Sequence, residues 1–399
     1  MVAALRSFLF SWTSVTPVLG LLVLAVAWGR DLGPVAVAVV AVALGATVLA
    51  AVHHAEVVAH RVGEPFGSLV LAVAVTVIEV ALIVTMMVSG GPEAGSLARD
   101  TVFAAVMITT NGIVGISLLV GARRYGTTLF NPEGSGAALA TVATLATLSL
   151  VLPTFTSSTP GPAFSPAQLT FAALASLALY GTFVLTQTKR HRDFFLPVAA
   201  DGEVTNPTKS RPALDRYAPL PQKPSGRDCG RIGNERHSKE DDHADPPSNR
   251  AALGSLALLL VALVAVVGLA KVESPAIEAG VRAAGFPQSF VGVVIALLVL
   301  LPETLAATRA AQRDRMQISL NLAYGSAIAS IGLTIPAIAL ASLWLPGELL
   351  LGLGSTQIVL LALTVVVSVL TVVPGRATRL QGGVHLVLLA GFLVLAVNP

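Results

Sequence analysis

The sequence is short of charged residues, aromatic residues and cysteine. Charged residues make up 12% of the 399 residues and aromatic residues 5%, whereas about a quarter of the residues in a soluble domain are charged. Because so few charges cannot cover a surface that faces water, the composition excludes an ordinary soluble globular protein. The single cysteine, Cys229, has no partner for an intramolecular disulfide bond.

Long apolar segments occupy most of the chain instead. Hydrophobic residues make up 54% of it, and the mean hydropathy is +0.78. Several segments exceed the roughly 18 residues that cross the hydrocarbon core of a bilayer as a helix. The strands of a membrane barrel would be shorter, about ten residues each, and would alternate apolar and polar residues. We therefore predict an all-α polytopic membrane protein with about eleven transmembrane helices. They lie near residues 8–28, 35–55, 66–90, 102–121, 137–152, 168–187, 251–270, 287–307, 317–343, 349–373 and 381–397.

The first segment, 8–28, resembles the core of a signal peptide because Arg6 precedes it. It is longer than such a core, however, and Trp12 and Trp28 lie at its ends like interfacial anchors. We expect it to be retained as an N-terminal transmembrane helix within residues 1–30.

Lysine and arginine are distributed unevenly over the loops. With the N-terminus in the cytoplasm, 9 of the 25 fall in cytoplasmic segments, 4 in external segments and 12 between Lys189 and Arg250, which is also a cytoplasmic stretch. This distribution follows the positive-inside rule. We expect the N-terminus in the cytoplasm, the C-terminus outside and the protein in the cell membrane. The basic balance thus reflects topology, and no nucleic-acid partner is expected.

Residues 188–250 form the only long polar stretch. They are rich in proline, aspartate, lysine and arginine and have no apolar period, which is typical of a flexible linker. The acidic run from Glu240 to Asp245 could bind a divalent cation, but no ligand spacing is imposed there. We interpret it as a solvated acidic patch.

The two halves around this linker resemble each other. The matched residues, in chain order, are Phe66 and Phe290, Glu79 and Glu303, Arg99-Asp100 and Arg313-Asp314, and Asn111 and Gly325. In both halves the phenylalanine precedes the glutamate by 13 residues, and the last residue lies 11 beyond the aspartate. When the first helix is set aside, five predicted helices precede the linker and five follow it. Because five is an odd number, the second unit must enter the membrane from the side opposite to the first. We predict two inverted repeats, 31–187 and 251–399.

Glu79 and Glu303 are the only two of the 22 acidic residues that fall within the predicted apolar segments. A charge at the bilayer centre costs about 2.5–3.5 kcal/mol on insertion scales. A single buried glutamate could be structural, but two at matched repeat positions favour a functional pair. We predict that both bind the transported cation and protons.

Neutral groups near the glutamates could complete the site. Pro302 lacks a backbone donor, and Gly112 and Gly325 could open the helices that follow the glutamates, which would free carbonyls as ligands. Close packing of helices through small residues is the alternative for these glycines. Carboxylate, amide and hydroxyl oxygens are the ligands that calcium prefers. The candidate neutral ligands are Asn111, Ser326, Thr76 and Thr110.

Two carboxylates that share a site of low dielectric would titrate as a coupled pair. Two protons or one divalent cation neutralise such a pair equally well. An empty, doubly charged site would be costly to carry across the membrane, so the two fluxes would be coupled.

A second polar cluster lies at the inner end of the second apolar segment and in the loop after it, and consists of His53, His54, Glu56, His60 and Glu64. It could be an entrance for protons or metal ions, but polar residues at the membrane interface need no such role, and we favour that interpretation. The sequence contains no nucleophile constellation, phosphate loop or zinc spacing. No cofactor is expected.

In the stretches around Glu79 and Glu303, the sequence resembles the calcium/cation antiporter superfamily. It is most similar to bacterial calcium/proton antiporters that also exchange sodium or potassium for protons. The stretches Gly63 to Ser68 and Val75 to Glu79 resemble the first repeat of that group, and Leu301 to Thr304 with Tyr324 to Ser326 resemble the second. Where the wider superfamily has Gly-Asn before each glutamate, this sequence has other residues, so the resemblance covers the glutamates but not the neutral ligands.

The resemblance implies a ten-helix inverted-repeat core, an additional N-terminal helix and alternating access at Glu79 and Glu303. We expect a secondary transporter that exports calcium in exchange for protons, with the lipid bilayer, inorganic cations and protons as its partners. A sodium/proton or potassium/proton antiporter on the same scaffold is the nearest alternative. An intramembrane enzyme would need a nucleophile or metal set, and a non-transporting scaffold would not need paired acids.

Overall fold

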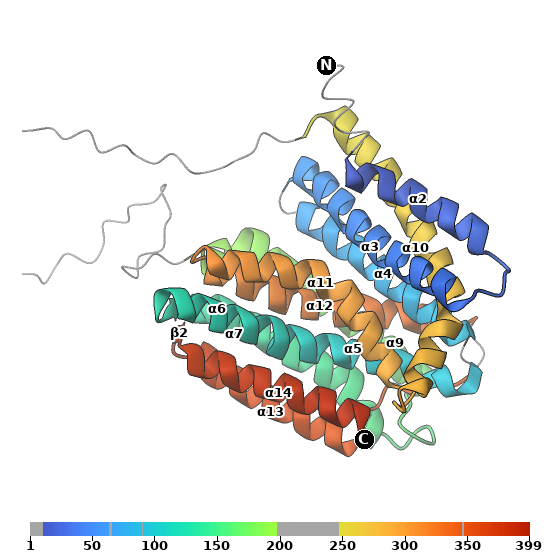
Figure 1. The fold of residues 1–399 in the computed structure, drawn as a ribbon. Coiled ribbons are helices and arrows are strands. Elements are labelled where there is room, and N and C mark those ends of the chain that lie inside the picture. The colour runs from blue at the N-terminus through green and yellow to red at the C-terminus, as the bar shows by residue number, and fades with distance from the viewer. Residues whose placement is uncertain (1–10, 64–65, 90, 198–246, 345–346) are drawn as a thin grey trace, which may run out of the picture.

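The computed structural model describes residues 11–63, 66–89, 91–197, 247–344 and 347–399, which form a bundle of long helices (Figure 1). Nine helices in this part of the chain are long and apolar enough to cross a membrane, and two shorter apolar helices, Trp12–Ala27 and Ala72–Val88, accompany them. Each predicted apolar segment corresponds to one helical span. The predicted all-α polytopic architecture of about eleven transmembrane helices is therefore confirmed.

Six spans precede the linker. Their elements are α2 (Trp12–Ala27), α3 (Pro34–Val62), α4 (Phe66–Ser89), η1 (Gly91–Ser96), α5 (Leu97–Met107), η2 (Ile108–Ile113), α6 (Val114–Tyr125), α7 (Pro132–Ala146), η3 (Thr147–Val151), α8 (Leu152–Phe155), α9 (Pro166–Leu185), η4 (Thr186–Arg190) and η5 (Arg192–Phe195). Local sequence sets several of these starts. At α9, for example, Pro166 occupies the first turn, and Ser165 and Gln168 form a capping box.

Five spans follow the linker. They are α10 (Asn249–Ala283), α11 (Phe290–Gln312), α12 (Met316–Ala341), α13 (Ser355–Val372) and α14 (Arg379–Val397). Two short strands pair in antiparallel orientation and connect the two halves. Strand β1 (Thr128–Leu129) lies between α6 and α7, and β2 (Arg376–Ala377) lies between α13 and α14.

The spans alternate in direction, which defines two ends of the bundle. At the end from which residues 190–197 and 247–250 emerge, here called the linker end, Arg61 Nε donates a hydrogen bond to Asn249 Oδ1 at 2.8 Å. At the opposite end, the amide of Leu350 donates to the carbonyl of Gly95 at 3.0 Å. Figure 1 shows the start of α10 and the last turn of α14 at opposite ends.

The two five-helix repeats pack on each other in matching pairs. The second span of each repeat contacts the third span of the other, so α4 lies against α12 and α11 lies against α5 and α6. The fifth and third spans pair across the repeats in the same way, α9 with α12 and α14 with α6, while α3 packs along α10. This reciprocal packing is the arrangement that an inverted repeat produces.

The apolar interior forms two groups of side chains. One surrounds α3, α4 and α10, and the other surrounds α5 to α9 and α12 to α14. Helices α4 and α11 each contribute side chains to both groups, so these two helices lie where the groups meet. The predicted glutamates are on these two helices.

The predicted helix interruptions differ between the repeats. In the first repeat, the third span contains the π-helical turn η2, which includes Gly112. In the second, α12 continues through Gly325 and α11 continues through Pro302, so the predictions of a break at those two residues were wrong. A proline in a helix removes one hydrogen bond, and neighbouring spans can hold the helix together around it.

Two helices extend beyond their predicted ends and include further acids, among them one that is exposed and one that is buried. Helix α3 continues to Val62 and therefore includes Glu56, and α10 continues to Ala283 and includes Glu273, which is buried. Asp100, at the start of α5, is buried as well and paired with Arg99. The expectation that only two acids lie within the spans was therefore wrong.

Candidate functional site

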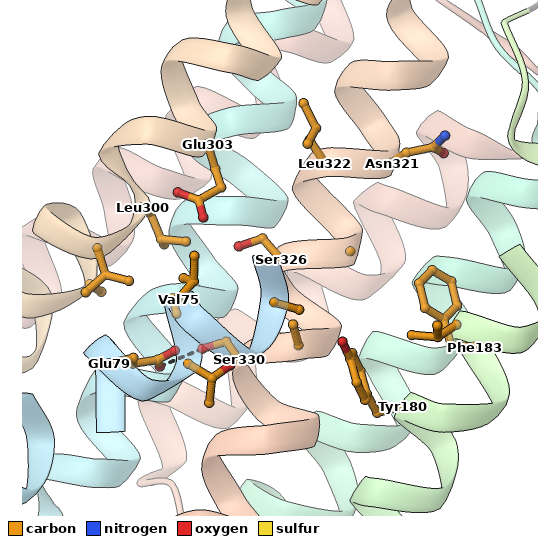
Figure 2. A pocket seen from close by; sticks show the side chains of 18 of the residues that line it. Val75, Glu79, Tyr180, Phe183, Leu300, Glu303, Asn321, Leu322, Ser326 and Ser330 are labelled. Atoms are coloured by element: carbon orange, nitrogen blue, oxygen red, sulfur yellow. Dashed lines mark hydrogen bonds between the residues drawn. The ribbon is translucent and has the colours of Figure 1, made fainter. Parts of the chain in front are cut away.

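A cavity of about 170 Å³ lies between α4, α5, α9, α11 and α12. Both predicted glutamates line it, Glu79 from α4 and Glu303 from α11. Figure 2 shows the two carboxyl groups on one side of the cavity, with the side chains of Ser326 and Ser330 on α12 beside them. Residues 224 positions apart in the chain thus meet at one site because α4 and α11 both pack against the third span of the opposite repeat.

The Glu79 carboxyl group is buried and fixed by a hydrogen bond. Its side chain is 4% exposed, and Ser330 Oγ donates to its Oε1 at 2.6 Å. An ionised carboxylate needs such donors when it is withdrawn from water. Glu79 is therefore held by α12 at the wall of the cavity, which Ser330 also lines.

The Glu303 carboxyl group has a different environment. Its Oε2 atom is buried but has no hydrogen-bond partner in the described part of the chain. A buried oxygen without a donor is costly, and a proton or a cation bound at Glu303 Oε2 would offset this cost.

The neutral residues predicted as ligands fall into two places. Thr76 and Ser326 line the cavity. Asn111 and Thr110 do not, because Asn111 donates to Thr364 Oγ1 on α13 at 3.0 Å and Thr110 donates to the carbonyl of Val106 within its own helix. The prediction that these two residues share the glutamate site does not hold in this structure.

The glycines and the proline of the predicted site have distinct surroundings. No atom lies within 4 Å of the position that a Cβ on Gly325 would occupy, so this glycine leaves open space at the cavity. A Cβ on Gly112 would lie 3.2 Å from Leu389 of α14. Gly112 therefore permits close packing of α14, whereas Gly325 keeps the cavity wide.

Ser330 is a cavity residue that the sequence interpretation missed. It follows Ser326 by four residues, and residues four apart in a helix lie on the same face. Leu322, Ser326 and Ser330 all line the cavity at this spacing. That spacing was a signal from which Ser330 could have been found.

Two further polar side chains, Gln187 of η4 and Asn321 of α12, line the cavity toward the linker end. Asn321 Nδ2 donates to the carbonyl of Phe195 at 2.7 Å, which ties α12 to η5. Tyr180 and Phe183 of α9 form the wall opposite the glutamates (Figure 2). The cavity thus combines one apolar wall with acidic and hydroxyl groups facing it.

Within the part of the chain that the structure describes, the histidine cluster of His53, His54, Glu56 and His60 forms no group of metal-binding side chains. His54 is buried and its Nε2 lies 2.9 Å from the carbonyl of Thr13 on α2, whereas His53, Glu56 and His60 are exposed. No group of three or more His, Cys, Asp or Glu residues in the described ranges could hold a metal ion. Glu64 and the acidic run from Glu240 to Asp245 lie outside the described residues.

Comparison with known proteins gives one family. The sodium/calcium exchanger protein family matches residues 32–189 and 254–398, which are the two repeats without the linker. A putative ionic transporter of Sinorhizobium fredii, y4hA, is 40% identical over 395 residues, 97% of this chain and 96% of its own. The sodium-potassium/proton antiporter ChaA of Escherichia coli is 34% identical over 383 residues, 95% of this chain and 94% of its own.

Solved structures share the fold. The structure of native YfkE superposes with a TM-score of 0.65 at 15% identity, covering 97% of this chain and 99% of the other. The H+/Ca2+ exchanger CAX superposes with a TM-score of 0.63 at 14% identity, covering 96% of this chain and 86% of the other. At these identities the likeness concerns the fold.

Proposed function

Because this chain belongs to the sodium/calcium exchanger protein family, we propose that it is a secondary antiporter that exports a cation, calcium first, in exchange for protons bound at Glu79 and Glu303. One observation carries the proposal. Two carboxyl groups from matched positions in the two repeats line the same cavity, and one of their oxygens is buried without a partner within the described residues.

The charge of the site supports exchange of this kind. Two ionised carboxyl groups carry two negative charges, which one Ca²⁺ ion or two protons would balance. Hydroxyl oxygens of Thr76, Ser326 and Ser330 are hard ligands within the same cavity. Ser330 can donate to the empty carboxylate and turn its oxygen lone pairs toward a bound cation.

Sodium or potassium is the alternative cation. The 34% identity to the sodium-potassium/proton antiporter ChaA over nearly the full length of both chains favours it. One carboxylate with one monovalent ion, and the other with a proton, would also leave the site neutral. The stoichiometry therefore differs between the two cases, two protons for Ca²⁺ and one or more for Na⁺ or K⁺.

The membrane orientation belongs to the same proposal. We place the linker end in the cytoplasm because the short loops there and residues 188–250 hold most of the lysine and arginine residues. The domain boundaries follow as 1–30 for the N-terminal helix, 31–187 and 251–399 for the repeats, and 188–250 for the linker. The cell membrane is the compartment in which such an orientation exports cations.

Ion flux in proteoliposomes tests the function. Purified protein is reconstituted with a pH-sensitive dye inside, and proton movement is recorded after adding Ca²⁺, Na⁺ or K⁺ outside. Calcium-dependent proton efflux with a KM lower than that for Na⁺ and K⁺ supports the proposal. Proton flux with sodium or potassium alone assigns the alternative, and no cation-dependent flux with correctly inserted protein overturns both.

A further inference from the structure

A buried histidine, His385, lies on α14 outside the glutamate cavity. Its side chain is fully buried, and it is the seventh residue of a span that begins at Arg379. Its two ring nitrogens contact different elements. Nδ1 lies 3.1 Å from Asn111 Oδ1 on η2, and Nε2 lies 3.1 Å from Thr371 Oγ1 on α13.

These contacts form a continuous chain of donors and acceptors. Asn111 Nδ2 donates to Thr364 Oγ1 at 3.0 Å, and Thr364 Oγ1 donates to Met107 Sδ at 3.6 Å. The amide oxygen of Asn111 can only accept, so the hydrogen of the histidine ring is on Nδ1. Nε2 then accepts from the hydroxyl group of Thr371. The neutral ring therefore satisfies every member of the network.

Two glycines hold α14 close to α6 at this level. A Cβ on Gly115 would lie 3.1 Å from the Cβ of His385, and a Cβ on Gly382 would lie 2.7 Å from the backbone nitrogen of Leu119. The helices are therefore in direct contact beside the ring. Of the two ring contacts, only the one with Asn111 joins α14 to η2, because Thr371 lies on α13.

The elements packed around the ring bring no free carboxyl group to it. Helix α13 and η2 contain no ionisable residue. The ionisable residues of the other neighbouring elements are Arg123, Arg124 and Tyr125 at the linker end of α6, Arg99 and Asp100 paired with each other at the opposite end of α5, Arg379 on α14 and Arg376 on β2. A second proton on the ring would make Nε2 a donor, from which the Thr371 hydroxyl oxygen could accept, but it would also add a positive charge without a counter-ion among these elements. A buried charge of this kind is costly unless water reaches it, so protonation favours separation of α14 from η2.

We propose that His385 is a third proton-binding residue of the transport cycle, which holds α14 against η2 when it is neutral and releases it when it is protonated. The inference rests on the proposed function, because it adds a second place in the antiporter at which a proton binds. Element η2 also packs against α11, the helix that bears Glu303. Movement of η2 would therefore be transmitted to Glu303 through the contact between η2 and α11.

Hydrogen–deuterium exchange of the full chain in lipid nanodiscs tests the proposal. The readout is protection of the backbone amides of residues 108–113, corrected for the intrinsic pH dependence of exchange. Protection should fall as the pH falls. If the local opening of η2 takes up one proton, the opening equilibrium changes by at most about tenfold per pH unit. His385→Asn keeps a donor near the Nδ1 position but cannot titrate, so its protection should not depend on pH. His385→Gln is the second variant if that one does not fold.

The matched control is His54→Asn, which removes another buried histidine that is bonded to Thr13 rather than to η2. It should keep the pH dependence of the wild type. If the wild type shows no pH dependence at residues 108–113, or if His385→Asn and His385→Gln keep it, His385 is not the proton-binding residue.

A double variant separates this proposal from the proposed function. Glu79→Gln with Glu303→Gln removes the titrating carboxyl groups of the cavity, yet the pH dependence at residues 108–113 should persist. Loss of that dependence would assign it to the glutamates and overturn the role of His385. Cation/proton transport by the double variant would overturn the two-glutamate function. The hydrogen–deuterium exchange result for His385 would not be affected by that outcome.

Discussion

Ser330 Oγ lies 2.6 Å from Glu79 Oε1 and donates a hydrogen bond to it, although the two residues are 251 positions apart in the chain. Among the described residues, Glu303 Oε2 has no such donor. Ser330 follows Asp314 by 16 residues, and the residue 16 positions after the matched Asp100 is Ile116. The repeats therefore supply a hydroxyl group to one glutamate and an apolar side chain at the corresponding position for the other.

This asymmetry predicts the effect of Ser330→Ala. A hydrogen bond to a charged group contributes about 1.5–3 kcal/mol, so we expect kcat/KM for the cation to fall by about tenfold or more. Initial exchange rates over a range of cation concentrations measure it. Ser319→Ala is the control, because Ser319 Oγ on the same helix is buried and has no partner among the described residues. Equal losses in both variants would contradict a specific role for Ser330.

Replacement of either glutamate by glutamine should abolish exchange. Glutamine keeps the size of the side chain but neither ionises nor titrates, so Glu79→Gln and Glu303→Gln should each fall to background while the protein still inserts. Glu273→Gln should retain most activity, because Glu273 is a buried acid on α10 that does not line the cavity. Cation-dependent proton flux in vesicles measures all three. Near-normal exchange by either site variant would refute the two-carboxylate mechanism.

Two glycines of α12 should respond oppositely to a side chain. At Gly325 a Cβ meets nothing within 4 Å, so Gly325→Leu should fold normally but fill part of the cavity and reduce exchange severalfold. At Gly332 a Cβ would lie 2.8 Å from Tyr180 Cβ, so Gly332→Ala should destabilise the protein by about 1–3 kcal/mol. Thermal unfolding in detergent and exchange rates separate the two effects. A lower melting temperature for Gly325→Leu would show that its position is filled rather than open.

The single cysteine allows a direct test of orientation. We expect Cys229, within residues 188–250, to lie in the cytoplasm because of the Lys and Arg distribution. A membrane-impermeant maleimide should therefore label the wild-type chain in inverted vesicles but not in intact cells. Labelling of intact cells from outside would reverse the orientation of the whole bundle.

Apolar length and the repeated spacing were sufficient to predict the spans and the glutamate pair. Hydrophobic segments of this length have one stable arrangement in a bilayer, since the helix satisfies every backbone group internally. The ends of the helices were less well determined. Helix α10 runs 13 residues past its predicted end at residue 270, because packing against α3 and α4 can bury polar residues such as Glu273 that local hydropathy places outside the span.

The sequence by itself determined that Glu79 and Glu303 occupy matched positions in two inverted repeats, because that follows from order and spacing along the chain. Which side chains complete their surroundings was decided only by the tertiary structure. The π-helical turn η2 and the packing of α14 on α6 direct Asn111 toward Thr364 and His385, away from the cavity. The continuous α12 instead presents Ser330 to Glu79. Such contacts depend on how helices from different repeats are rotated against each other, which a pattern within one segment does not specify.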